Sequence, residues 1–113
     1  MPPKQLQVAG GESVDLAART IFAIPPGVDR WKYPWLLLTP SRLLLSKPKA
    51  FGRPQVDFAV DWPTVSRVEG QMWNGYGPQI ELSVTTQRGT LALVVEAVNA
   101  ADIESAIRSA YLR

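Results

Sequence analysis

The stretch Trp35-Leu36-Leu37-Leu38-Thr39-Pro40-Ser41-Arg42-Leu43-Leu44-Leu45 decides the fold class of this chain of 113 residues. Each of its two apolar runs has the length of a strand, and the Pro40-Ser41 pair between them is typical of a turn. We therefore expect a β-hairpin that joins residues 35–39 to residues 42–47.

Further short strands are predicted on both sides of this hairpin. Residues 14–24 alternate in polarity and end at Pro25-Pro26-Gly27, although a helix over residues 12–19 is the alternative for their first half. Strands are also expected over residues 55–62 and 65–69. A second hairpin, around residues 80–84 and 91–95, is joined through Gln87-Arg88-Gly89, where Gly89 supplies the left-handed backbone that such a turn needs.

The last segment has a helical period. Asn99 is the predicted N-cap, and the apolar positions fall on one face of a helix. These positions are Ile103, Ala106, Ile107, Ala110 and Tyr111. Seven short antiparallel strands leave exposed edges unless they curl up or stack, so we expect a mainly β fold: a seven-stranded, partly open barrel capped by one C-terminal α-helix. Residues 1–11 are expected to form a flexible tail and residues 12–113 the single domain.

Composition argues against catalysis. The chain has neither cysteine nor histidine, which removes the usual thiolate nucleophile, the commonest general base and the commonest metal ligands. Asp57, Asp61 and Glu69 are the remaining acid–base candidates, but alternation places the first two on a solvated outer face. We therefore expect a non-enzymatic domain without cofactor or metal. The polar start and the lack of a membrane-length apolar run predict a cytoplasmic protein.

Positive charge is concentrated in the middle of the chain. Residues 25–56 carry six bases and one acid, a net charge of +5, whereas the remainder carries six bases and nine acids, a net charge of −3. Aromatic residues lie in the same loops, and loop arginines with aromatics are typical of interface anchors. The predicted binding residues are Arg30, Trp31, Lys32, Tyr33, Lys49, Phe51, Arg53 and Trp73. For the bases, the alternative is an ordinary solvated face. For the aromatic rings, the alternative is that they fold back and plug the barrel. Nucleic-acid binding is disfavoured.

A second candidate surface follows from the hairpin. If Leu36 and Leu38 face the core, Leu37 and Leu44 lie on the outer surface, where Ile21 joins them from the neighbouring strand. Such an outward strip indicates contact with a protein partner or a second copy of the chain. Coverage by the N-terminal tail or a neighbouring loop is the alternative.

The sequence resembles the pleckstrin-homology-like superfold, in particular the compact bacterial type related to the GRAM domain. The resemblance is carried by Gly11-Glu12, by Arg19-Thr20, by residues 35–45 and by the short element Trp62 to Val68. The resemblance implies the fold and says little about function. The absence of catalytic residue types and the two candidate surfaces predict an interaction or adaptor domain that binds a protein partner or a second copy of itself, and peripheral binding to anionic membrane lipids is the alternative. The lysine and arginine run of lipid-binding members is represented by Arg30 and Lys32 only.

Overall fold

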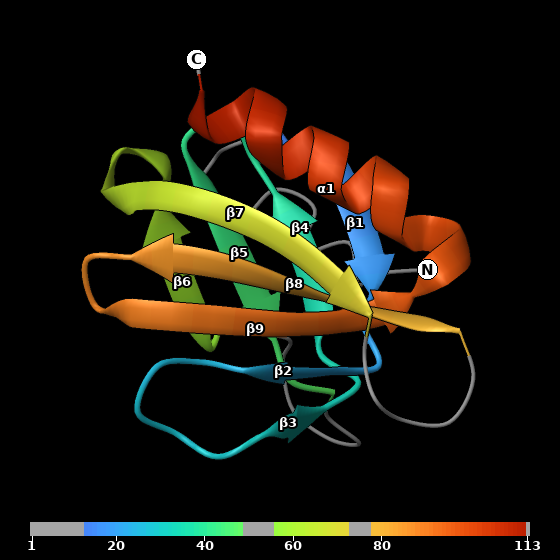
Figure 1. Cartoon of the computed structure of the whole chain (residues 1–113). Coiled ribbons are helices and arrows are strands. Elements are labelled where there is room, and N and C mark those ends of the chain that lie inside the picture. The colour runs from blue at the N-terminus through green and yellow to red at the C-terminus, as the bar shows by residue number, and fades with distance from the viewer. Residues whose placement is uncertain (1–12, 49–55, 73–77, 113) are drawn as a thin grey trace.

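The computed structural model describes residues 13–48, 56–72 and 78–112, which form two antiparallel sheets and one long helix (Figure 1). The four-stranded sheet has the order β1 (Leu16–Arg19), β4 (Trp35–Leu38), β5 (Arg42–Ser46) and β6 (Phe58–Asp61). The five-stranded sheet has the order β3 (Trp31–Lys32), β2 (Phe22–Ile24), β9 (Gly89–Glu96), β8 (Gln79–Thr86) and β7 (Val65–Met72). A 3-10 helix, η2 (Trp62–Thr64), joins β6 to β7, and the chain ends in α1 (Ala97–Tyr111).

Both predicted hairpins are confirmed. In the first, Leu37 of β4 pairs with Leu44 of β5, and the flanking leucines pair in the same register. Thr39 closes its turn, because the backbone N–H of Arg42 donates to the Thr39 hydroxyl oxygen at 3.1 Å. In the second, Thr86 of β8 pairs with Gly89 of β9, and Gly89 has the expected positive φ of 127°.

The first predicted strand, residues 14–24, is wrong as a single element. Its first half, β1, pairs with β4 in one sheet, and its second half, β2, pairs with β9 in the other. The chain crosses between the sheets at Thr20, which is 1% exposed. The chain crosses back after β3, a strand that the sequence did not reveal. The division of residues 14–24 and the additional strand β3 raise the strand count of the described residues from the expected seven to nine.

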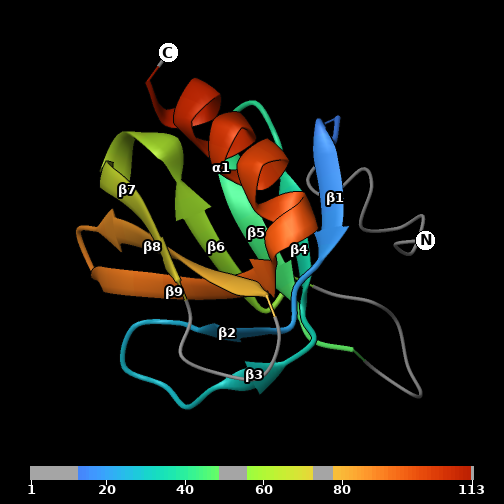
Figure 2. The ribbon, with the colours of Figure 1, turned by 45° about the vertical axis from the view of Figure 1, so that its right-hand side comes forward.

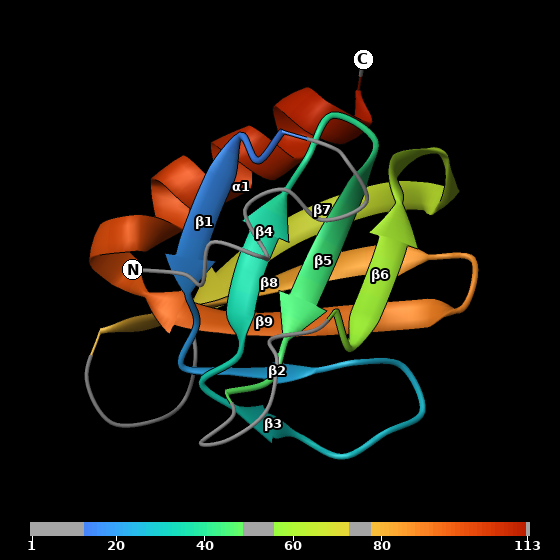
Figure 3. The same cartoon turned by 180° about the vertical axis from the view of Figure 1, so that it is seen from behind.

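The barrel is also corrected, because the two sheets stack without closing into one shell. The four-stranded sheet ends at β1 and β6, and the five-stranded sheet ends at β3 and β7. Figure 3 shows the four-stranded sheet from its outer side, with the five-stranded sheet behind it. The main core fills the space between the two sheets and contains buried residues of both together with those of α1.

Helix α1 lies across one end of the two sheets, as the turned view shows (Figure 2). Ile103 and Ile107 are 2% and 0% exposed, so the predicted apolar stripe faces the core. Its start is corrected: the helix begins at Ala97 with Glu96 as N-cap, one turn earlier than a cap at Asn99 implies. Arg108 joins the helix to β7, because its Nη2 donates to the Val68 backbone oxygen at 2.8 Å. No helix in the described ranges is long and apolar enough to cross a membrane.

Trp62 connects the corner after β6 to the first hairpin. Its side chain is 4% exposed, and its indole N–H donates to the Thr39 backbone oxygen at 2.8 Å. Pro63 stands in the first turn of η2, where its fixed φ suits the helix and its missing N–H removes no helical hydrogen bond.

Ile107→Ala is expected to lower the free energy of unfolding by about 2–5 kcal/mol, because it leaves a cavity at the contact between helix and sheets. Urea denaturation followed by circular dichroism measures this loss. Val98→Ala is the control on the same helix, since Val98 is 79% exposed, and it should change the free energy by less than about 0.5 kcal/mol. Equal losses in the two variants would contradict the buried stripe.

Trp62→Phe is expected to cost about 1–3 kcal/mol, because it keeps an aromatic ring but removes the buried indole donor. The matched control is Trp35→Phe. Trp35 is half-buried, and within the described residues its indole N–H makes no hydrogen bond. The same denaturation experiment compares the two, and a larger loss in Trp35→Phe would show that the bond to Thr39 contributes little.

Candidate binding site

Three cations lie over aromatic rings near the crossings between the sheets. The Arg19 Cζ lies 4.9 Å from the centre of the Trp35 ring, and the Arg30 Cζ lies 4.9 Å from the centre of the Phe22 ring. The third pair is formed by Lys47 Nζ, 4.6 Å from the centre of the Trp31 ring. Each distance is within the range of a cation–π interaction.

The crossing from β3 to β4 connects these pairs. Tyr33, between the two strands, has a φ of 53°, an uncommon left-handed conformation. Its backbone N–H donates to the Ile21 oxygen at 2.9 Å, and its own oxygen accepts from Arg19 Nε at 2.7 Å. The bond from Arg19 holds the guanidinium beside the strained residue.

We call these residues together the basic-aromatic rim, because they surround the two crossings of the chain. Strand register places them on different faces. Arg19 and Trp35 lie on the outer face of the four-stranded sheet, Phe22 and Lys32 lie on the outer face of the five-stranded sheet, and Trp31 faces the core between the sheets. The rim consists of Arg19, Phe22, Arg30, Trp31, Lys32, Tyr33, Trp35 and Lys47.

The rings of the rim differ in how far they reach into solvent. Trp31 is half-buried and packs edge-on against Phe58, with ring centres 6.5 Å apart, at the margin of the main core. Trp31 therefore packs inward, although the structure has no closed barrel for it to plug. Tyr33 is 54% exposed, and the Phe22 ring is 8% exposed beneath Arg30.

The positive charge of the rim is not neutralised by ion pairs within the described residues. The ion pairs found there join Arg67 to Glu69 and Arg108 to Glu104, both away from the rim. Asp57 lies next to it and accepts the backbone N–H of Lys47 on Oδ2 at 2.7 Å. The rim therefore presents cations whose side chains are held by rings and a carbonyl oxygen.

The sequence prediction and the rim overlap in four residues, Arg30, Trp31, Lys32 and Tyr33. Lys49, Phe51, Arg53 and Trp73 lie outside the described residues. The strands that flank Trp73 end beside the start of α1, since the Ala97 N–H donates to the Pro78 oxygen at 2.9 Å. The turn at the opposite end of β8 lies beside the loop after β2, because a Cβ on Gly89 would approach Pro26 Cβ to 3.2 Å.

Sequence reasoning missed four members of the rim, namely Arg19, Phe22, Trp35 and Lys47. Arg19 and Trp35 are directly paired across β1 and β4. Alternation within each strand indicated that Arg19 points outward, but only the register between strands places it over a ring.

The predicted apolar strip has a different environment from the one expected. Leu37 and Leu44 do lie on the outer face of the four-stranded sheet, but both are 0% exposed, in a small cluster with Val14, Val56 and Ala59. Ile21 does not join them: Ala17 is the residue that pairs with Leu37, and Ile21 donates its N–H to Val94 in the other sheet. A partner contact through these residues stays a prediction.

A shallow groove of about 400 Å³ adjoins the rim where β1 crosses to β2. Arg19, Ile21 and Tyr33 line one side, and Glu96 and Asn99 at the start of α1 line the other. It extends the rim toward the helix and adds polar groups to it.

The three carboxylates considered as general acids or bases each have a different environment. Asp57 accepts a backbone N–H at the rim, Glu69 pairs with Arg67 on β7, and Asp61 is exposed at the end of β6. Within the described residues no group of three or more acidic side chains is placed to hold a metal ion.

Comparisons of the structure show a pleckstrin-homology-like fold. The C-terminal domain of an unknown protein from Leishmania infantum matches with a TM-score of 0.66 at 15% identity, covering 97% of this chain and 94% of that one. A structure of the Vav1 exchange factor with its PH and C1 domains matches with a TM-score of 0.65 at 10% identity and covers 98% of this chain. The match spans 28% of the Vav1 chain. No protein-family model and no curated protein matches the sequence.

Tyr33→Gly is expected to be more stable than Tyr33→Ala by about 1 kcal/mol. Both variants remove the exposed ring, but only glycine adopts a φ of 53° without strain. Thermal and urea denaturation of the two variants measure the difference. Equal stability would contradict a left-handed residue at this crossing.

Proposed function

We propose that this chain is a non-enzymatic interaction domain that binds an acidic surface of a protein partner through the basic-aromatic rim. The supporting observation is the set of three cation–ring pairs whose charges meet no ion-pair partner within the described residues. The relation to the bacterial GRAM type and the cytoplasmic location belong to the same proposal.

Pre-ordering of the cations favours binding. A free lysine or arginine side chain loses up to about 2 kcal/mol of rotamer entropy when a contact fixes it. The side chains of Arg19, Arg30 and Lys47 already lie over rings in the free domain, so they lose less rotamer entropy when a partner binds. A carboxylate on the partner then gains a charge-assisted hydrogen bond to a side chain that is already oriented.

A protein partner fits the rim better than a membrane does. Each base contributes about 1 kcal/mol near an anionic bilayer, so four bases supply about 4 kcal/mol, a dissociation constant of about 1 mM. Stable attachment also needs apolar groups that enter the lipid. Most rim rings are instead half-buried or covered, with Phe22 8% exposed, and Tyr33 is the ring that is mainly exposed.

The test uses fluorescence anisotropy with a fluorescein-labelled twelve-residue peptide of alternating glutamate and serine. Binding by the full chain should weaken as salt rises. Lys32→Glu should weaken it at least about fivefold relative to the unaltered chain. Arg67→Glu is the matched control, because it makes the same change in net charge on β7, away from the rim, and it should alter binding less than twofold.

Equal effects of the two substitutions would show general electrostatic attraction and overturn the rim as the site. Co-sedimentation with vesicles of phosphatidylcholine, with or without phosphatidylserine, tests the other class of ligand. Retention on anionic vesicles together with no binding of the peptide would replace the protein partner with a membrane surface. Light scattering of the unaltered chain shows whether the partner is a second copy.

A further inference from the structure

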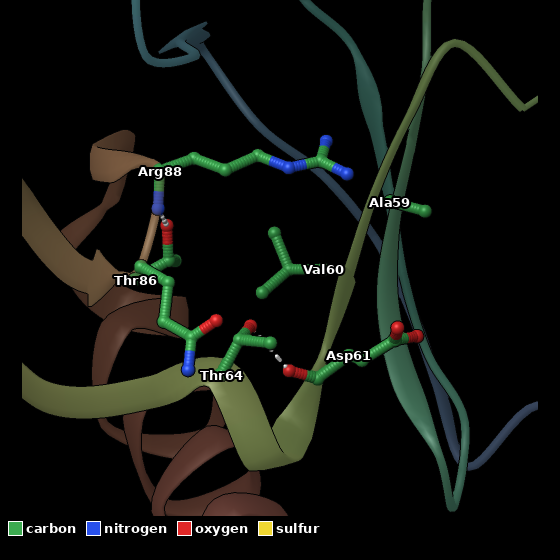
Figure 4. Close-up of a pocket in the computed structure, with 7 residues that line it drawn as sticks. Ala59, Val60, Asp61, Thr64, Thr86 and Arg88 are labelled. Atoms are coloured by element: carbon green, nitrogen blue, oxygen red, sulfur yellow. Dashed lines mark hydrogen bonds between the residues drawn. The ribbon is translucent and has the colours of Figure 1, made fainter.

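A separate pocket lies at the corner where β6 passes through η2 into β7. It has a volume of about 160 Å³ and faces the turn between β8 and β9 (Figure 4). Ala59 and Val60 of β6 line one side, and Thr64, Thr86 and Arg88 supply polar groups. None of these residues belongs to the basic-aromatic rim.

Hydrogen bonds fix the walls of this pocket. The Gln87 N–H donates to the Thr64 backbone oxygen at 3.2 Å and so ties the turn to the corner. The Thr64 hydroxyl donates to the Asp61 oxygen at 2.7 Å, and the Thr86 hydroxyl donates to the Gly89 oxygen at 2.8 Å. Both hydroxyl protons are thereby used, so toward a ligand the two hydroxyl oxygens can only accept, and the Thr86 oxygen already accepts one backbone N–H from Arg88.

Arg88 places its charge over the pocket. Figure 4 shows its side chain reaching from the turn toward β6, past Val60, while the carboxylate of Asp61 points away from the pocket. Its backbone N–H donates to the Thr86 hydroxyl at 3.1 Å. Within the described residues the guanidinium forms neither a hydrogen bond nor an ion pair.

We propose that this pocket binds a carboxylate, supplied by an aspartate or glutamate side chain of a partner polypeptide. The planar guanidinium fork matches the two oxygens of a carboxylate. Among the residues that the structure describes, Arg88 is the one base that lines the pocket, and Asp61 adds a nearby negative charge. A single negative charge therefore fits better than the double charge of phosphate. The acceptor oxygens of the two threonines suit an N–H of the same partner residue.

This inference deepens the proposed function, since it gives an acidic partner a specific anchor outside the rim. The two are tested by different probes. The small carboxylate used below is not long enough to engage the rim as well, whereas the glutamate–serine peptide tests the rim through Lys32→Glu. Either result can therefore fail while the other holds.

The experiment is an NMR titration of the full, ¹⁵N-labelled chain with N-acetylglutamate α-amide, which carries one carboxylate. We expect saturable shifts of the Arg88 Nε–H signal and of the backbone amides of Thr64 and Thr86, at millimolar concentrations. N-acetylglutamine α-amide has the same shape without the charge and should cause no saturable shift. Inorganic phosphate should bind more weakly than the glutamate derivative.

Arg88→Gln should weaken binding at least about tenfold, because it removes the charged fork. Arg88→Lys keeps the charge but not the fork and should retain part of the affinity. Arg67→Gln, a change of the same kind on β7, should leave the titration unchanged. Saturable shifts with the glutamine derivative, shifts centred on Lys32 instead, tighter binding of phosphate, or no effect of Arg88→Gln would each overturn the proposal.

Discussion

The structure depends on two neighbouring crossings of the chain between its sheets. The Pro34 backbone oxygen accepts both the N–H and the hydroxyl of Thr20, at 3.1 and 2.9 Å. Tyr33 returns a hydrogen bond from its N–H to the Ile21 oxygen. Because Thr20 is buried, leaving its hydroxyl without an acceptor would carry the desolvation cost of a buried polar group. These bonds fix where one sheet ends and the other begins.

The candidate binding surface is a consequence of these crossings. Arg19 ends β1 just before one crossing, and Trp35 begins β4 just after the other. The crossings bring cation and ring together, although they are sixteen positions apart in the sequence. Phe22 and Trp31 stand on the other side of the same crossings, so the domain gathers its rings where both sheets meet. The same backbone hydrogen bonds at the crossings therefore position both the core residues and the charged side chains.

The sequence pattern predicted those elements that are determined by residues close together in the chain. The two hairpins follow from turn residues and alternation, and the buried face of α1 follows from its period, so the sequence was sufficient for them. The division of residues 14–24 was missed because alternation continues through Thr20 unchanged, and only the identity of the neighbouring strand shows the crossing. The helix start was missed because Glu96 caps α1 without a side-chain hydrogen bond, so it leaves no sequence signal of that kind.

The candidate site was predictable only in part for the same reason. Charge and aromatic content located Arg30 to Tyr33 without any knowledge of pairing. Arg19 and Lys47 meet their rings across strands, at distances that depend on register. The outer leucines show a related limit: alternation placed Leu37 and Leu44 on the correct face, but it gives no measure of exposure, and both are fully buried.

The bond from Arg108 to Val68 lies at an edge of the five-stranded sheet. In the described part of the chain four strands form the edges of the two sheets, and three of them are short, with β7 the long one at eight residues. A long edge strand with unpaired backbone N–H and C=O groups is a template with which another chain can pair. The Arg108 guanidinium donates a hydrogen bond to one backbone carbonyl of this edge. The bulge between Val65 and Arg67 increases the local twist of β7, so that a flat strand fits against it less well. The terminal helix thus shields the strand most exposed to intermolecular β-pairing.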